Sequence, residues 1–174
     1  MLISCTKDEL LAKINIVSKA VASKTTMPIL ECILITADKD GVKLMANNLE
    51  LAIETSPMNA EISEKGAVAP EAKMFLEIIR SLPENELSIE TDDKGIMLIK
   101  SGKSEFKIMA LPAEEFPSLP DVEKNIKYET KPDVLKNMIK QTIFSVAVEE
   151  TKPILTGELI EIKENCFNIV AIDG

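Results

Sequence analysis

The sequence predicts an α+β protein in which amphipathic helices pack on antiparallel sheet. Within residues 1–110, two segments carry apolar residues at helical spacing, and each is followed by short segments that are apolar-rich or alternate apolar with polar residues. Turns rich in Gly, Asp and Ser separate several of these short segments, as in antiparallel hairpins. The order strand, helix and three strands therefore occurs twice, which predicts a duplicated β-α-β-β-β unit with its helices layered on the sheet.

The first of these units begins with a strand at residues 2–5 and a helix at residues 8–21. Apolar residues recur along the helix every three or four positions from Leu10, which predicts one buried face. Thr6 and Glu9 have the spacing of a capping box at the start of the helix. The three strands that we expect next span residues 29–36, 42–47 and 49–55.

The second unit begins with a strand at residues 60–69, interrupted by Glu64-Lys65-Gly66, and continues with a helix at residues 71–82. Pro70 precedes this helix and Pro83 ends it. Residues 111–120 contain three prolines, which indicates a linker or an ordered loop. The three strands that we expect before that loop span residues 86–90, 96–100 and 105–109.

After this loop the chain repeats its own beginning. When residue 8 is set beside residue 133 without gaps, segment 28–30 (PIL) falls on segment 153–155 (PIL), and many apolar positions coincide. Such agreement predicts a duplication on the scale of a domain. We expect residues 1–120 to form one complete domain and residues 121–174 to begin a second, truncated one, in which a strand at residues 165–172 lacks the rest of its sheet.

The composition restricts the possible functions. Histidine is absent, which removes the commonest general base, the Ser-His and Cys-His nucleophile systems and most zinc sites. The net charge of −9 alone argues against nucleic-acid binding, which normally appears as a basic surplus. The charge is unevenly distributed, however, because segments 7–24, 71–80 and 131–145 together hold nine basic and five acidic residues, a net of +4, while the rest of the chain holds 11 basic and 24 acidic residues, a net of −13.

The cellular compartment is predicted from the absence of membrane and signal segments and from the cysteine spacing. No apolar run approaches the roughly 18 residues of a membrane span, and charged residues follow the first apolar residues too soon for a signal peptide. The odd set of Cys5, Cys32 and Cys166 has no metal-ligand spacing, so we expect three buried free thiols. These features predict a cytoplasmic protein that neither binds a cofactor nor associates with a membrane.

Several short segments together resemble the bacterial DNA polymerase III sliding clamp (beta subunit) family, and they cover the whole chain. Their joint order and spacing make the resemblance specific. They are segments 27–30 (MPIL), 46–50 (ANNLE), 80–83 (RSLP), 100–106 (KSGKSEF), 111–117 (LPAEEFP), 144–147 (FSVA), 152–157 (KPILTG) and 171–174 (AIDG).

The resemblance implies a DNA-clamp fold, with two helices packed on antiparallel sheet in each domain, and a non-catalytic processivity factor. Two subunits of three similar domains close a ring around duplex DNA in this family. The ring tethers the replicative polymerase, the clamp loader and repair proteins through short peptide motifs. The present chain would be an N-terminal portion, which we do not expect to close a ring alone.

The same resemblance assigns candidate site residues. Positions that contact DNA in related clamps are matched by Lys24, Lys73 and Arg80, and helix placement adds Lys13, Lys136 and Lys140. Such contacts go to phosphates and carry no sequence information. The subunit contact of the homodimer is matched by Lys100, Lys103, Phe106 and Ile108. Part of the groove for partner peptides is matched by Leu155, Ile172 and Gly174.

Two other functions remain open from the sequence alone. A generic interaction scaffold without a DNA role predicts that the helix lysines scatter around the helix axes instead of sharing one face. A magnesium-dependent hydrolase would use clustered carboxylates, although neither cluster has defined ligand spacing. The candidate clusters are Glu114, Glu115 and Asp121, and Glu149 and Glu150.

Overall fold

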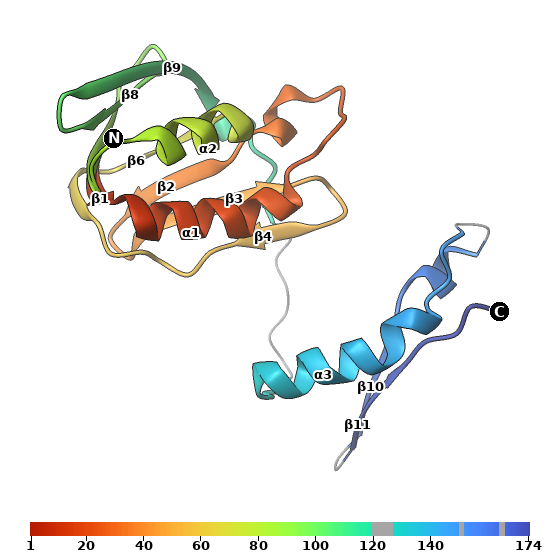
Figure 1. The fold of residues 1–174 in the computed structure, drawn as a ribbon. Coiled ribbons are helices and arrows are strands. Elements are labelled where there is room, and N and C mark those ends of the chain that lie inside the picture. Colours follow the sequence, from red (N-terminus) through yellow and green to blue (C-terminus); the bar gives the residue numbers. More distant parts are fainter. Residues whose placement is uncertain (120–126, 150–151, 164–165) are drawn as a thin grey trace. The chain divides into compact units, whose positions relative to one another are not determined.

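The computed structural model describes residues 1–119, 127–149, 152–163 and 166–174 (Figure 1). The chain divides into two compact units, unit 1 (Met1–Pro120) and unit 2 (Asp121–Gly174). Among the described residues, no helix combines the length and the apolar character that crossing a lipid bilayer requires.

Unit 1 contains the order strand, helix and three strands twice, as the sequence predicts. β5 runs into β6 across Lys65, where an interruption is expected. Short 3₁₀ turns lie at Ser18–Ala20, Pro28–Glu31 and Ala113–Glu115. The elements are β1 (Leu2–Thr6), α1 (Lys7–Val17), β2 (Leu34–Asp38), β3 (Gly41–Asn47), β4 (Ala52–Glu54), β5 (Glu61–Glu64), β6 (Gly66–Pro70), α2 (Ala72–Ser81), β7 (Glu86–Thr91), β8 (Ile96–Ser101) and β9 (Ser104–Pro112).

The strands of residues 1–119 form one nine-stranded antiparallel sheet in the order β4-β3-β2-β6-β9-β8-β7-β1-β5. The strand before each helix pairs with the strands of the other half, because β1 pairs with β7 and β6 pairs with β2. β6 also pairs with the last residues of β9, from Val68↔Pro112 to Pro70↔Ala110. Since one residue joins β5, at the end of this order, to β6 near its middle, the sheet curves back on itself.

The two helices of unit 1 lie side by side (Figure 1) and share one core with strands from both halves. Burying a large aliphatic or aromatic side chain contributes roughly 1.5–3 kcal/mol, so these faces fix the helices on the sheet. The buried helix residues are Leu10, Ile14 and Val17 of α1 and Ala72, Phe75 and Ile79 of α2.

The start of α1 corrects the predicted capping box. The Thr6 side chain makes no capping hydrogen bond, and the Glu9 carboxylate accepts instead from the backbone N–H of Asn59 at 3.0 Å. Asn85 provides the cap, because its Oδ1 accepts from the backbone N–H of Asp8 at 3.1 Å and its carbonyl accepts from that of Lys7 at 2.6 Å. A residue distant in sequence therefore satisfies the free donors of the helix start.

The start of α2 is capped by the residue that directly precedes the helix. Glu71 stands at the N-cap, where its two carboxylate oxygens accept from the backbone N–H groups of Lys73 at 2.9 Å and Met74 at 2.8 Å. A carboxylate at this end also interacts favourably with the helix dipole. Leu82 ends the helix one residue before Pro83.

Four predicted element boundaries were wrong. Residues Pro28–Glu31 form a 3₁₀ turn where a strand was expected to begin, the helix from residue 8 changes to a 3₁₀ turn after Val17, and β9 extends through Pro112 into the predicted loop. The alternating segment 49–55 gives a strand only at Ala52–Glu54. Leu49 has a φ of 75° and a side chain 63% exposed.

Side-chain hydrogen bonds explain the shortened strand. Asn47 Oδ1 accepts from the backbone N–H of Leu49 at 2.7 Å, and Asn48 Oδ1 accepts from those of Glu50 at 3.0 Å and Leu51 at 2.8 Å. Asn side chains that bond the backbone two residues on build turns and compete with strand pairing.

Unit 2 repeats the first part of unit 1. It contains α3 (Pro132–Thr142), β10 (Leu159–Lys163) and β11 (Cys166–Val170), with 3₁₀ turns at Ile143–Ser145 and Pro153–Thr156. Each of these elements begins at the position that the sequence alignment assigns to its counterpart in unit 1. The loop bonds recur as well, because the Ala22 N–H donates to the Leu30 carbonyl at 3.0 Å and the Ala147 N–H to the Leu155 carbonyl at 2.9 Å. The duplication is therefore visible in the backbone.

The cysteines meet the prediction in part. Cys5 and Cys32 are buried free thiols, but Cys166 is exposed at the first position of β11. The apolar sequence around Cys166 does not bury it because β11 pairs only with β10 in the two-stranded sheet of unit 2.

Candidate nucleic-acid interface and partner sites

α1 and α2 are held together by polar contacts at their ends. Lys7 Nζ, in the first turn of α1, donates to the carbonyl oxygens of Arg80 at 3.0 Å and Leu82 at 2.8 Å, at the end of α2. The helices therefore run antiparallel, and the ammonium satisfies two free carbonyl groups of the α2 C-terminus. Arg80 Nη2 in turn donates to Asn15 Oδ1 of α1 at 3.2 Å.

The outward face of α2 carries two of the predicted DNA-binding residues. Lys73, Glu77 and Arg80 are exposed and stand four and three residues apart, opposite the buried face. Residues at this spacing lie on one side of a helix. Among the described residues, neither Lys73 nor Arg80 takes part in an ion pair, so their charges remain free on one surface.

Lys24 lies in the exposed loop between the two 3₁₀ turns that follow α1. The bond from the Ala22 N–H to the Leu30 carbonyl closes this loop at its base. Beyond the loop, Cys32 forms a β-bridge with Glu71, the N-cap of α2. The loop that carries Lys24 is thus anchored beside the start of the helix that carries Lys73.

Lys13 is placed differently from the other helix lysines. Its side chain is half-buried, and Nζ donates to the carbonyl oxygen of Ser56 at 3.2 Å and to its hydroxyl oxygen at 2.9 Å. Lys13 therefore ties the flank of α1 to the segment after β4. Lys19 is absent from the predicted site, but it is exposed in the 3₁₀ turn that follows α1. Its place in the net positive segment 7–24 is the sequence signal that could have identified it.

In unit 2, Lys136 and Lys140 are exposed and lie four residues apart on one face of α3, together with Asp133 and Asn137. By the alignment of the two copies, Lys140 stands at the position that Asn15 occupies in unit 1. The two units therefore present different polar groups at one equivalent helical position.

The segment predicted for subunit contact is an open sheet edge. β9 pairs with β8 from Ser104 to Met109, but β6 reaches only its last residues from Ala110 onward. Along residues 104–109 the outer side of β9 therefore has no partner strand within the described residues. Such an edge is a template for another chain.

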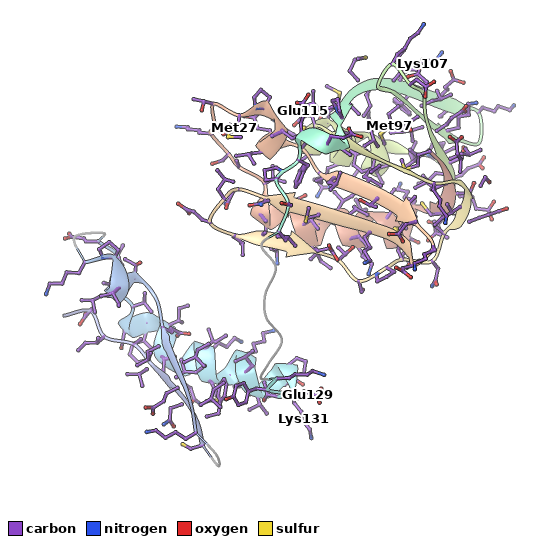
Figure 2. The ribbon with its side chains drawn as sticks, turned by 180° about the vertical axis from the view of Figure 1, so that it is seen from behind. Met27, Met97, Lys107, Glu115, Glu129 and Lys131 are labelled. Carbon is purple, nitrogen blue, oxygen red and sulfur yellow. The ribbon has the colours of Figure 1, made fainter. Side chains whose placement is uncertain are left out.

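The predicted interface side chains divide between core and surface. Ile108 is 9% exposed and belongs to the core, and Phe106 is half-buried against it. Lys100 and Lys103 are exposed. The apolar side chain that this edge exposes most is Met109, at 68%, and Lys107 on the same strand is labelled in Figure 2.

Leu155 and Gly174 come together in unit 2. They line a pocket of about 330 Å³ with Ala147, Val148, Glu149, Lys152 and Asp173. A Cβ placed on Gly174 would lie 3.3 Å from Leu155 Cδ1, which shows how closely the two approach. Ile172 does not line this pocket, and its side chain is 60% exposed.

The carboxylate clusters do not form a metal centre among the described residues. Glu114 and Glu115 lie in the 3₁₀ turn after β9, and no group of three or more Asp, Glu, Cys or His side chains in the described ranges could hold a metal ion. Asp121 and Glu150 lie outside the described residues.

The sequence matches two domain families. Residues 1–120 match the DNA polymerase III beta subunit, N-terminal domain, and residues 129–174 match its central domain. The Beta sliding clamp of Halalkalibacterium halodurans is 37% identical and that of Bacillus subtilis 36% identical, each over 97% of this chain. The chain spans 46% of the length of each.

Solved structures agree with these matches. A putative DNA polymerase III beta subunit from Eubacterium rectale superposes with a TM-score of 0.95 at 45% identity, covering 100% of this chain and 47% of that one. The DNA polymerase sliding clamp from Bacillus subtilis gives a TM-score of 0.93 at 35% identity, covering 99% of this chain and 47% of that one. The chain therefore belongs to the DNA polymerase III beta subunit family, whose N-terminal and central domains it matches.

Proposed function

We propose that the protein carrying this chain is a cytoplasmic DNA sliding clamp, a non-catalytic processivity factor that encircles duplex DNA and tethers a polymerase. The observation that carries the proposal is the outward face of the α1–α2 pair. Within the part of the chain that the structure describes, Lys73 and Arg80 form no ion pair there, and Lys24 is exposed on a loop anchored beside the start of α2. These cations lie on a protein whose net charge is −9.

Positive side chains on one helix face of an acidic protein suit a mobile contact with DNA. Duplex DNA presents about one negative charge per 1.7 Å of helix axis, so cations on a rigid helix face meet phosphates in any register. Phosphate contacts carry no sequence information, which allows sliding. The acidic remainder of the surface repels DNA and leaves the helix face as the favourable side. In unit 2, the exposed Lys136 and Lys140 would make the same kind of phosphate contact, whereas the bonds of Lys13 to Ser56 favour a structural role for that lysine.

Two further surfaces support ring assembly and partner binding. The open edge of β9, flanked by Lys100 and Lys103, offers a strand to a second subunit, with Phe106 behind it. In unit 2 the pocket beside Leu155 and Gly174 would receive part of a partner peptide. A related clamp from Bartonella birtlesii has been solved bound to griselimycin.

The DNA contact is tested by charge reversal. We expect Lys73→Glu with Arg80→Glu to weaken binding of the 174-residue chain to a fluorescein-labelled duplex at low salt. The slope of log K against log[salt] should fall by about two, one for each lost phosphate contact. Fluorescence anisotropy across a salt series measures both quantities.

A matched control separates position from net charge. Lys39→Glu with Lys94→Glu changes the net charge equally, but these residues lie on the β2–β3 and β7–β8 turns. The control should keep most of the salt slope. Equal losses in the two double variants would remove the helix face from the DNA contact and favour the interaction scaffold.

Encirclement needs a separate test. In a chain extended to the length of its relatives, we expect retention on a nicked circular plasmid and loss from the same plasmid after linearisation, because a ring that encircles DNA cannot leave a circle but slides off a free end. Equal retention on both forms would count against a ring. The hydrolase alternative would require magnesium-dependent cleavage or phosphate release that Glu115→Gln abolishes.

A further inference from the structure

The Arg80 guanidinium is held by a neutral side chain of the neighbouring helix. Nη2 donates to Asn15 Oδ1 at 3.2 Å across the α1–α2 pair, and both side chains are exposed on its outward side. The Lys7 bonds to the Arg80 and Leu82 carbonyl groups fix the end of α2 against α1. Residues of α1 therefore position both ends of Arg80: Lys7 holds its backbone carbonyl, and Asn15 accepts from its guanidinium.

The charged groups around Arg80 make the neutrality of Asn15 significant. Glu77 stands three residues earlier on the same face of α2, within the spacing at which helix ion pairs form. Lys73 precedes it by one turn, and Asp8 lies on the outward side of α1. Among the described residues no carboxylate pairs with Arg80 within 4.0 Å. A carboxylate partner would neutralise the guanidinium, whereas the Asn15 amide orients it and leaves its charge available.

Orientation before binding has a physical consequence. An arginine side chain has several rotatable bonds, and part of their conformational entropy is lost when the guanidinium is fixed on an oxyanion. A guanidinium that is already restrained loses less on contact, so binding is stronger. One Nη2 hydrogen is used by Asn15, and the other guanidinium donors remain for a phosphate.

We propose that Asn15 is a positioning residue that holds the Arg80 guanidinium outward and uncompensated, ready for a phosphate of duplex DNA. The proposal rests on the proposed function, because it gives Arg80 a phosphate partner. It adds a residue of a different chemical class to the DNA-facing surface, one that acts through another side chain.

The test compares Asn15→Ala, which removes the acceptor, with Asn15→Asp, which keeps the shape and adds a charge. NMR of the Arg80 Nε–Hε group in the free 174-residue chain should show a restrained side chain in the wild type and a mobile one in Asn15→Ala. Affinity for a 20-base-pair duplex should fall about two- to tenfold in Asn15→Ala, since one side chain must be ordered on binding. The salt slope should stay unchanged, because Arg80 still reaches the phosphate.

Asn15→Asp should behave differently. Its carboxylate pairs with Arg80, so the salt slope should fall by about one, as in Arg80→Ala. In an Arg80→Ala background, Asn15→Ala should have no further effect on DNA affinity, because it acts only through Arg80.

Three results would overturn the proposal. An Arg80 signal that is insensitive to Asn15→Ala would show that Asn15 does not restrain the side chain. An equal loss of affinity from Asn15→Ala with and without Arg80 would indicate a structural role. If Arg80→Ala leaves DNA binding unchanged while the NMR signal depends on Asn15, the contact stands and the DNA role of Arg80 is wrong.

Discussion

At the scale of single residues, the two buried cysteines have environments that keep them protonated. Burial, and next the charge of Glu9, raise the pKa of Cys5 to about 12. Burial, followed by the charges of Glu71 and Glu31, raises the pKa of Cys32 to about 11. The thiolate is the nucleophile and the metal ligand, so both residues function as small apolar groups of the core.

These pKa values predict a loss of stability at alkaline pH. Unfolding returns each thiol to an ordinary pKa near 9.0, so the unfolded chain releases protons that the folded chain retains. The stabilising contribution is complete below pH 9 and is lost as the pH rises toward 11 for Cys32 and 12 for Cys5. Between pH 9, the ordinary pKa of the thiol in the unfolded chain, and pH 12, its pKa in the folded chain, Cys5 should lower the free energy of unfolding by up to about 1.4 kcal/mol per pH unit.

Cys5→Ala provides the comparison, because alanine does not titrate. Urea unfolding at several pH values should give a shallower decline above pH 9 for Cys5→Ala than for the wild type, whatever the offset at neutral pH. Parallel curves would show that the Cys5 thiol ionises equally in both states.

Single residues also show which features of the candidate site could be predicted from the sequence and which could not. The exposure of Lys24, Lys73 and Arg80 follows from helical spacing and loop position, both of which are local. The bonds of Lys13 to Ser56 and of Arg80 to Asn15 join residues 43 and 65 positions apart. No local pattern predicts them, because they depend on how α1 packs against the rest of unit 1.

At the scale of elements, the two helices of unit 1 begin in different ways, which allows a matched experiment. Glu71→Ala removes the acceptor of two backbone N–H groups and should lower the free energy of unfolding by about 1 kcal/mol. Thr6→Ala changes the equivalent N-cap of α1, whose side chain makes no such bond, and should have little effect. Thermal and urea unfolding of both variants measure the difference. Equal losses would mean that the Glu71 hydrogen bonds do not stabilise α2.

Periodicity predicted the helices and most strands of unit 1 because each element buries one face, and burial imposes the period. Two of the errors fall where side chains bond backbone groups. Asn47 and Asn48 turn the chain through residues 49–51, although Leu49, Leu51 and Ile53 alternate as a strand would. Thr6 stands at the N-cap of α1 as predicted, but its side chain makes no capping bond, and Asn85 supplies the acceptor from the loop before β7. In the first case hydrogen bonds override an apolar alternation, and in the second a residue distant in sequence replaces the local capping side chain.

At the scale of the whole molecule, duplication explains both how the two halves of unit 1 are joined and where its long open edge lies. Each half contributes a strand to the other half, which ties the halves together and leaves short strands β4 and β5 at the ends of the strand order. β6 pairs only with the last residues of β9, so residues 104–109 have no partner on their other side among the residues that the structure describes. The sequence indicated this segment only by resemblance, because strand order cannot be obtained from local patterns.

The direction of the β9 hydrogen bonds gives a prediction about assembly. The Ala110 N–H donates to the Gly95 carbonyl, and bonded pairs alternate along an antiparallel ladder, so Phe106 and Ile108 bond β8 while the N–H of Lys107 points to the open edge. Lys107→Pro therefore removes an outward donor and leaves the β8 ladder intact, as proline is tolerated on edges. In a chain extended to the length of its relatives, sedimentation should show a dimer for Lys107→Ala and a monomer for Lys107→Pro. If both variants are dimers and their unfolding curves match that of the wild type, the subunit contact lies elsewhere. The reason is that, of the two variants, only Lys107→Pro lacks the outward backbone donor.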